Sequence, residues 1–336
     1  MILMLKKNTT HPEAEQLLQR LISMGFNAVK EQKGDRIAIA IVSGIDTNTK
    51  ESEFSRLPNV ESVETFSETF KLAGREFRDQ PLVIDVRGKK IGGDAICVMA
   101  GPCSIESEAQ IHRIAESVKA AGADFLRGGA FKPRTSPYDF QGLGEEGVYY
   151  IRDAAHKNDM VSVSEVMDIE QLEIALGNID ILQIGARNMQ NYSLLKAIGK
   201  TRTPVMLKRG FAATYREFLM AAEYILNAGN PNVILCERGI RTYESYTRNT
   251  LDIGAVPVLK ELSHLPIIID PSHGTGIRNM VAPMSRAAIA AGADGIMVEV
   301  HYDPDRSYSD AQQAISCESF SEMMPSLFAI RAAIMK

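Results

Sequence analysis

From residue 97 to its end, the sequence alternates short apolar runs rich in β-branched residues with longer segments of helical periodicity. The predicted strands are 97–102, 124–129, 161–166, 181–185, 204–208, 233–237, 266–270 and 295–300. Strands that alternate with helices build parallel sheets, and eight such units in roughly 240 residues match the usual size of a (β/α)8 TIM barrel. A doubly wound open sheet is the alternative, but no Gly-x-Gly-x-x-Gly fingerprint follows the first strand. We therefore predict an α/β barrel over 97–336.

Residues 1–67 have a different pattern and are predicted to form a small α+β domain. Their strand and helix candidates follow the order β-α-β-β-α-β, at 1–7, 11–26, 28–32, 36–42, 49–57 and 60–66. This order is that of a ferredoxin-like split βαβ sandwich. Residues 68–96 are predicted to be a linker with a β-hairpin that turns at Arg87 and Gly88. Nothing in the first 67 residues indicates catalysis.

The composition limits the classes of partner. The 336 residues carry a formal net charge of -5, which argues against nucleic acid because binding a phosphate backbone needs a basic face. No apolar run approaches the roughly 18 residues of a membrane span, and the first charges follow the apolar residues, the reverse of a secretory signal. Cys97, Cys103, Cys236 and Cys317 lack disulfide or zinc-finger spacing. We expect a cytoplasmic protein that binds neither nucleic acid nor membranes.

Several types of metal ligand stand at or just beyond the ends of predicted strands. Cys103 follows the first strand, His273 follows the seventh, Glu299 and His301 end the eighth, and Asp310 lies in the loop beyond it. Active sites of TIM barrels lie where strands end and the following loops begin. Thiolate, imidazole and carboxylate together suit one divalent metal ion with mixed soft and hard ligands. Each residue taken alone has a simpler interpretation, His273 as a core histidine and Cys103 as a small apolar residue.

Cations also gather at the predicted strand ends, in a protein that is acidic overall. They are Arg127, Lys132, Arg134, Arg187, Lys208, Arg209 and Arg238. On one rim, and without compensation, they would repel one another, so they imply a multiply charged anionic ligand, most simply two phosphates and a carboxylate. A lone arginine at a strand end is more often a salt-bridge residue. Lys208 has a further interpretation as the nucleophile of a metal-free Schiff-base aldolase, and a sensor of small anions is the alternative outside enzymes.

Five motifs carry a resemblance to a known family. They are Ala100-Gly101-Pro102-Cys103-Ser104, the run from Arg127 to Ser136, Gln183-Ile184-Gly185-Ala186-Arg187, and the segments that hold His273 and Glu299. Over essentially its whole length the chain resembles 3-deoxy-D-arabino-heptulosonate 7-phosphate (DAHP) synthases with an N-terminal ferredoxin-like regulatory domain. The resemblance implies condensation of phosphoenolpyruvate with erythrose 4-phosphate and water, releasing phosphate, as the first step of the shikimate pathway.

The same resemblance implies roles for individual residues. Cys103, His273, Glu299 and Asp310 match the family's metal ligands, for Mn²⁺, Fe²⁺, Co²⁺ or Zn²⁺. The residues that match its phosphoenolpyruvate pocket are Arg127, Lys132, Arg187, Lys208 and Arg238, and those that match its aldose phosphate loop are Pro133, Arg134, Thr135 and Ser136. The metal ion is expected to act as a Lewis acid on the aldehyde. Lys132, Glu165 or a metal-bound water are the candidates for proton transfer.

The alternative within the superfamily is 3-deoxy-D-manno-octulosonate 8-phosphate synthase, which uses arabinose 5-phosphate. That family typically has Lys-Ala-Asn-Arg-Ser-Ser where this chain has Lys-Pro-Arg-Thr-Ser at residues 132–136, and it usually lacks an N-terminal domain. Both features favour the four-carbon sugar. The resemblance further implies that residues 1–67 bind tyrosine, phenylalanine or both as an effector, in a homotetramer. A domain that only sets the oligomeric state is the other interpretation of these residues.

Overall fold

The structure is a computed structural model that describes residues 1–44, 51–133 and 136–335. The chain divides into two compact units. One comprises Met1–Pro81 with Glu261–His264, and the other comprises Leu82–Lys260 with Leu265–Lys336. The assignment of residues 1–67 to a regulatory domain and of 68–96 to a linker stays a prediction.

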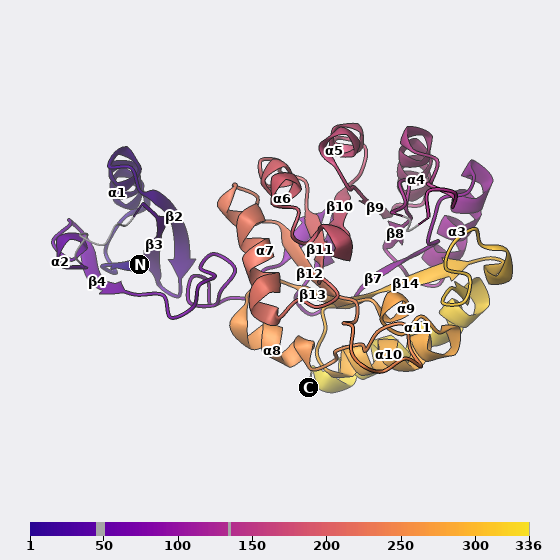
Figure 1. Ribbon diagram of the computed structural model, residues 1–336. Coiled ribbons are helices and arrows are strands. Elements are labelled where there is room, and N and C mark those ends of the chain that lie inside the picture. Colours follow the sequence, from indigo (N-terminus) through magenta and orange to yellow (C-terminus); the bar gives the residue numbers. More distant parts are fainter. Residues whose placement is uncertain (45–50, 134–135, 336) are drawn as a thin grey trace. The chain divides into compact units, whose positions relative to one another are not determined.

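Four antiparallel strands form the sheet of the first unit (Figure 1). The elements in chain order are β1 (Ile2–Leu5), α1 (His11–Ser23), β2 (Asn27–Lys33), β3 (Arg36–Ser43), α2 (Glu51–Phe54) and β4 (Val60–Glu64). Residues 49 and 50 of the second predicted helix lie outside the described residues. The strand order β2-β3-β1-β4, with every neighbouring pair antiparallel, is that of a split βαβ sandwich. The predicted element order is confirmed.

Helix α1 shows how this unit is held together. It begins with a capping box, in which the Thr10 side chain accepts from the backbone N–H of Glu13 while the Glu13 carboxylate accepts from that of Thr10. Its buried residues Leu17 and Leu21 pack in one core with Leu3 of the sheet. The apolar stripe of the helix is therefore what fixes it on one face of the sheet.

Eight parallel strands close into a barrel in the second unit. They are β7 (Cys97–Gly101), β8 (Phe125–Arg127), β9 (Val161–Glu165), β10 (Ile181–Ile184), β11 (Val205–Lys208), β12 (Val233–Glu237), β13 (Ile267–Ile269) and β14 (Gly295–His301). Each strand pairs with the next, and β14 pairs with β7 over five residues to close the ring. The strands are buried almost throughout, because helices cover the barrel on the outside (Figure 1). The predicted TIM barrel is confirmed, with all eight strands at their predicted positions.

The helices that surround the barrel follow the strands in alternation (Figure 1). They are α3 (Glu108–Ala120), α4 (Glu145–Lys157), α5 (Ile169–Ala175), α6 (Tyr192–Gly199), α7 (Tyr215–Asn227), α8 (Ala255–Leu262), α10 (Arg278–Ala290) and α11 (Cys317–Ile334). Shorter elements are β5 (Ile84–Val86) and β6 (Lys89–Ile91), which form the predicted hairpin, η1 (Ala186–Asn188), α9 (Pro271–Thr275), η2 (Pro304–Arg306) and β15 (Ile315–Ser316). Within the described ranges, none of the helices combines the length and apolar character that crossing a membrane requires.

Gly101 ends the first barrel strand at a position that only glycine fits. Its φ is +155°, and a Cβ atom built there would lie 2.0 Å from the carbonyl oxygen of Arg127 on the neighbouring strand. At Gly101 the backbones of the two strands approach closely, and Pro102 and Cys103 follow immediately in the chain. The glycine of the Ala-Gly-Pro-Cys motif thus serves to place the thiol.

Candidate active site at the carboxyl ends of the barrel strands

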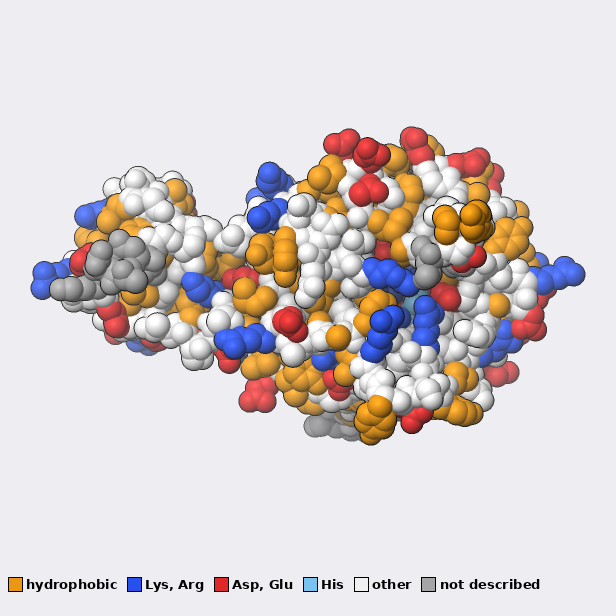
Figure 2. Space-filling model, in the orientation of Figure 1, with side chains coloured by type: hydrophobic (Ala, Val, Ile, Leu, Met, Phe, Trp, Pro, Cys, Tyr) orange, Lys and Arg blue, Asp and Glu red, His pale blue; other side chains and the backbone are white. Residues whose placement is uncertain are grey.

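A polar cavity of about 230 Å³ opens where the barrel strands end. Six cations line it: Arg127, Lys132, Arg187, Lys208, Arg238 and Arg248. The other lining residues are Pro133, Asp139, Glu165, Gln183, Gly185, Ala186, Phe211, His273 and Asp310. Figure 2 shows the gathered lysine and arginine side chains on this face of the barrel. Cations therefore outnumber carboxylates in the cavity of an acidic protein, which favours an anionic ligand.

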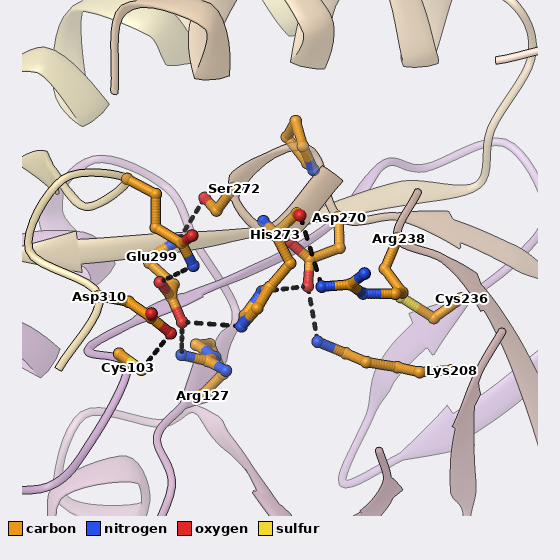
Figure 3. A network of polar contacts seen from close by, with 12 residues as sticks. Cys103, Arg127, Lys208, Cys236, Arg238, Asp270, Ser272, His273, Glu299 and Asp310 are labelled. Carbon is orange, nitrogen blue, oxygen red and sulfur yellow. Dashed lines mark hydrogen bonds and ion pairs between the residues drawn. The ribbon is translucent and has the colours of Figure 1, made fainter. Parts of the chain in front are cut away.

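Side chains that suit a metal ion meet beside this cavity. Ligand atoms of Cys103, Glu299 and Asp310 all lie within 4.8 Å of one another, and the Cys103 Sγ is 3.3 Å from Asp310 Oδ2. His273 is not one of these three residues, but its Nε2 lies 3.3 Å from Glu299 Oε1. Figure 3 shows the His273 ring between Asp270 and Glu299. Sulfur, nitrogen and carboxylate oxygen from distant parts of the chain form a donor set that fits a divalent ion.

Neighbouring groups hold these ligands in place. His273 Nδ1 lies 2.7 Å from Asp270 Oδ2, the arrangement in which a carboxylate orients a metal-binding imidazole. Glu299 Oε1 accepts from Arg127 at 3.0 Å and its Oε2 accepts from Gln313 at 2.6 Å. Strand β14 delivers Glu299, and the short helix α9 delivers His273.

Asp310 has a left-handed backbone conformation. Its φ is +51°, in the left-handed region that residues with a Cβ seldom occupy. Such strain persists where the surrounding structure imposes it, and it clusters at functional sites. Here it accompanies a carboxylate that points to the Cys103 thiol and to Arg248.

Burial and neighbouring charges shift the pKa values of this cluster. Burial, reinforced by Glu299, raises the pKa of the Cys103 thiol to about 12, while Lys132 acts in the opposite direction. Burial would also raise the pKa of Asp310, but the charges of His273 and Arg248 hold it at about 2. Burial lowers the pKa of His273 below its ordinary value. Binding of a cation to the thiolate would thus release a proton that the protein alone retains.

The six cations differ in how they are neutralised. Arg127 pairs with Glu299 at 3.0 Å, Lys208 with Asp270 at 2.6 Å, and Arg248 with Asp310 at 3.2 Å. Lys132 Nζ lies 3.1 Å from the Cys103 Sγ and donates to its carbonyl oxygen at 2.9 Å. Within the described ranges, Arg187 and Arg238 have no carboxylate partner. Burial lowers the pKa of Arg238, and its Nη1 atom is buried with no described hydrogen-bond partner.

The structure brings most of the predicted site residues together. Around the one cavity or the cluster beside it lie Cys103, Arg127, Lys132, Pro133, Glu165, Arg187, Lys208, Arg238, His273, Glu299 and Asp310. Arg134 and Thr135 lie outside the described residues. Ser136 is described but is not among the residues that line the cavity. Their roles in binding and catalysis stay predictions.

Two candidates from the sequence point elsewhere. The prediction that Arg209 joins the cation cluster is wrong, because its Nη1 pairs with Glu237 and with Asp252, each at 2.9 Å. His301 does not join the described group of metal ligands. Its Nδ1 accepts instead from the backbone N–H of Asp303 at 3.0 Å.

The pairing of Lys208 argues against its role as a Schiff-base nucleophile. Its Nζ is buried and lies 2.6 Å from the buried carboxylate of Asp270, which also contacts His273. The Nζ atom is thus engaged in an ion pair, whereas a Schiff-base nucleophile needs an amine that is free to attack a carbonyl group. Lys208 is better suited to neutralise charge in the cavity.

Sequence reasoning missed Arg248 and Phe211 and named Gln183 only as part of a family motif, without a role, yet all three line the cavity. Gln183 lies on strand β10, but Arg248 comes ten residues after Arg238, in a long loop. Nothing in the local pattern distinguishes it from a solvated loop arginine. Phe211 follows Gly210 directly after β11, where an aromatic residue resembles ordinary core.

The geometry agrees with comparisons to known proteins. Residues 76–332 match the model of the DAHP synthetase I family. The chain belongs to the DAHP synthetase I family. It is 46% identical to phospho-2-dehydro-3-deoxyheptonate aldolase of Thermotoga maritima over 324 residues, which cover 96% of each chain.

A solved structure and a second group of relatives extend this result. The crystal structure of the Thermotoga maritima phospho-2-dehydro-3-deoxyheptonate aldolase (DAHP synthase) matches with a TM-score of 0.79 and 44% identity, covering 99% of this chain and 97% of that one. A 2-dehydro-3-deoxyphosphooctonate aldolase from Koribacter versatilis is 31% identical over 270 residues, which cover 74% of this chain and 96% of the relative. The DAHP synthase relative is thus both more similar and matched over more of the chain.

Proposed function

We propose that this protein condenses phosphoenolpyruvate with erythrose 4-phosphate and water to give DAHP and inorganic phosphate, the first step of the shikimate pathway. The observation that carries the proposal is one cavity in which Arg187 and Arg238, two guanidiniums without carboxylate partners among the described residues, stand near a Cys, His, Glu and Asp donor set. The high identity to a DAHP synthase over nearly the whole chain supports the same activity.

The charges of the cavity suit the two substrates. Phosphoenolpyruvate brings a phosphate and a carboxylate. The phosphate can bind Arg187 and Arg238, for which the described residues offer no carboxylate partner, and Lys132 and Lys208 can neutralise the carboxylate. Guanidiniums bind phosphate oxygens with paired N–H groups, whereas an ammonium acts as a compact charge. The second phosphate, on the aldose, goes to the segment 133–136 in this proposal.

A divalent metal ion is the proposed cofactor, held by Cys103, His273, Glu299 and Asp310. The family is metal-dependent, and the closeness of thiol and carboxylates supports a site for Mn²⁺, Fe²⁺, Co²⁺ or Zn²⁺. When bound there, the ion supplies Lewis-acid polarisation of the aldehyde oxygen.

The protein's own residues account for the remaining chemistry. The methylene carbon of phosphoenolpyruvate attacks the aldehyde carbon, and the positive charge that develops at the enol carbon is met by water. Glu165, whose Oε2 accepts from Gln183 at 2.9 Å, is the carboxylate in the cavity proposed to take the proton of that water. Lys132 is proposed to give a proton to the new hydroxyl. As the C–O bond of the resulting hemiketal phosphate breaks, its hydroxyl proton passes to the departing phosphate, which leaves the keto group of DAHP and inorganic phosphate. A proton returned from Glu165 to Lys132 restores both side chains.

One assay tests the proposal. The protein is mixed with phosphoenolpyruvate and erythrose 4-phosphate, and loss of the enol absorbance and release of phosphate are followed. The mixture is repeated after chelation, after addition of each candidate metal, and with arabinose 5-phosphate in place of the four-carbon sugar. We expect metal-dependent turnover that prefers erythrose 4-phosphate. Preference for arabinose 5-phosphate would instead favour the octulosonate activity, and no turnover with any metal would contradict both.

Regulation by an aromatic amino acid is a second part of the proposal. Residues 1–67 contribute their own sheet and core, and the potential metal-ligand group in the described part of the chain lies entirely in the barrel. We propose that tyrosine, phenylalanine or both bind this domain in a homotetramer and thereby alter the activity of the barrel.

A further inference from the structure

Arg187 and Arg238, which have no carboxylate partner in the part of the chain that the structure describes, share one aromatic neighbour. The guanidinium carbon of Arg187 lies over the Phe211 ring at 5.6 Å from its centroid, and that of Arg238 lies over the same ring at 4.8 Å. These arginines follow β10 and β12, and Phe211 follows β11, the strand between them. Both cations thus lie over the same ring at the carboxyl end of the barrel.

Arg187 and Arg238 depend on this ring more than the other cations do. Carboxylates hold two neighbouring arginines in place. Arg127 pairs with Glu299, and Arg209 pairs with Glu237 and Asp252. Among the described residues, the guanidinium of Arg187 has a cation–π contact with the Phe211 ring and no ion pair. Arg238 adds only a 3.4 Å hydrogen bond to the carbonyl oxygen of His273. A ring face attracts a guanidinium without neutralising it, so the positive charge stays available to an anion.

Hydrogen bonds hold the backbone of Phe211 and of the loop around it. The carbonyl oxygen of Phe211 accepts from the backbone N–H of Arg241 at 2.7 Å, and the Arg241 guanidinium lies over the ring at 4.9 Å. Arg209 Nε donates to the carbonyl oxygen of Ala213 at 2.8 Å, which fixes the rest of this short loop. The backbone of Phe211 is therefore held in place, and a third guanidinium lies over its ring.

We propose that Phe211 is a positioning residue that holds Arg187 and Arg238 as a pair for the phosphate group of phosphoenolpyruvate. A carboxylate in its place would hold the arginines equally well but would compete with the phosphate for them. The aromatic ring gives orientation without competition. This inference rests on the proposed function, since it names a substrate of the same cavity.

The test compares Phe211→Leu with Phe211→Tyr, which keeps the ring face. In the metal-loaded protein, Phe211→Leu should raise the KM for phosphoenolpyruvate about ten-fold, with kcat and the KM for erythrose 4-phosphate within about two-fold of the parent. Phe211→Tyr should stay within about two-fold throughout. The matched control is Tyr224→Leu, because the Tyr224 ring also lies under a cation, with Lys196 Nζ 5.7 Å from the ring centroid. Tyr224 differs from Phe211 in that it lies on helix α7 and does not line the cavity.

Two further measurements separate positioning from a general structural role. If Phe211 acts through Arg187, the loss in Phe211→Leu/Arg187→Ala should be smaller than the product of the two single losses. Calorimetric titration with phosphoenolpyruvate alone measures binding without turnover. It should show weaker binding by Phe211→Leu than by the parent or by Phe211→Tyr. Thermal unfolding checks that each variant folds, and Phe211→Met replaces the leucine variant if that one does not.

Different results would contradict the proposed function and the role of Phe211. Lack of turnover in the parent contradicts the proposed function, whatever the variants do. With an active parent, an unchanged KM for phosphoenolpyruvate in Phe211→Leu overturns the inference alone. Equal increases in the KM for both substrates, or fully multiplicative losses in the double variant, overturn it as well.

Discussion

Arg248 Nη1 lies 3.2 Å from Asp310 Oδ1, which is 62 residues further along the chain. The same nitrogen donates to Gln313 Oε1 at 2.9 Å, and Gln313 Nε2 donates in turn to Glu299 Oε2 at 2.6 Å. One arginine in the loop after β12 is thus connected to two of the proposed metal ligands. Groups that orient ligands in this way commonly affect metal affinity by 10–100-fold.

Arg248→Ala should therefore weaken binding of Mn²⁺ by about 10–100-fold, as measured by titration against a competing chelator. Arg306→Ala is the matched control, because Arg306 also pairs with an aspartate, Asp303 at 3.8 Å, but is 87% exposed. Its metal affinity should equal that of the parent. Equal affinities for all three proteins would show that the loop does not support the ligands.

Cys103→Ser should lose most of the bound metal and most of the activity at ordinary metal concentrations. A hydroxyl near neutral pH is a much poorer anionic ligand than a metal-stabilised thiolate. Metal content after dialysis and turnover with added metal give the two measurements. Cys317→Ser, a half-buried cysteine at the start of α11, is the control that should change neither. A serine variant that binds metal like the parent would make Cys103 a structural residue.

The proposed division of the two phosphates predicts opposite selectivity in a pair of variants. Arg187→Ala should raise the KM for phosphoenolpyruvate more than that for erythrose 4-phosphate, and Arg134→Ala should do the reverse. Loss of a desolvated charge contact costs on the order of 2–5 kcal/mol. Steady-state kinetics with each substrate varied in turn measure both effects. The same pattern in both variants would refute the division.

The barrel could be predicted from the sequence because its strands are buried on both faces. Runs such as Ile267–Ile269 are apolar throughout and end in polar residues, so position and type are both visible without a structure. The rule that barrel sites lie at strand ends then brought Cys103, His273 and Glu299 to one place. This rule needs only the order of strands and helices, and the pattern of apolar residues in the sequence reveals that order.

The rest of the site depends on side-chain direction and on loops, which periodicity does not reveal. Lys208 and Arg209 are neighbours in the sequence, yet Lys208 pairs with Asp270 in the cavity while Arg209 turns to Glu237 and Asp252. Successive residues at a strand end point in opposite directions, so only one of two adjacent cations could face the cavity. Arg248 reaches it from a loop, where spacing carries no such information.

Lowering the pH should destabilise the first unit through His264. Its Nε2 lies 2.8 Å from the carbonyl oxygen of Leu72, and its Nδ1 is buried with no hydrogen-bond partner in the described part of the chain. Burial lowers the pKa of His264 from 6.5 to about 4. The folded protein therefore favours the neutral ring and the unfolded chain binds the proton first. Stability is complete above pH 6.5 and is lost as the pH falls towards 4.

Thermal unfolding of the parent and of His264→Gln between pH 7.5 and 4.5 measures this effect. The difference between the ordinary pKa of 6.5 and the pKa of about 4 in the folded protein corresponds to a loss of roughly 3 kcal/mol of folding free energy at most. His264→Gln should unfold at a lower temperature at pH 7.5 but should lose less further stability on acidification than the parent. His11→Gln, at the exposed start of α1, should behave like the parent. A parent with a flat profile over this range would contradict the buried neutral ring.

Deletion of residues 1–67 tests whether this segment regulates the barrel without taking part in its chemistry. An effector that binds one arrangement of the domains better than another changes activity by its differential affinity, and a coupling of about 1–3 kcal/mol corresponds to roughly 5- to 150-fold. The full chain should be inhibited by tyrosine or phenylalanine, and the truncated protein should turn over but ignore both. Sedimentation of both proteins separates regulation from assembly: loss of the tetramer with unchanged sensitivity would indicate a domain that only sets oligomeric state. Full sensitivity in a truncated protein would place the effector site in the barrel, because no part of the deleted segment would then be needed to bind it.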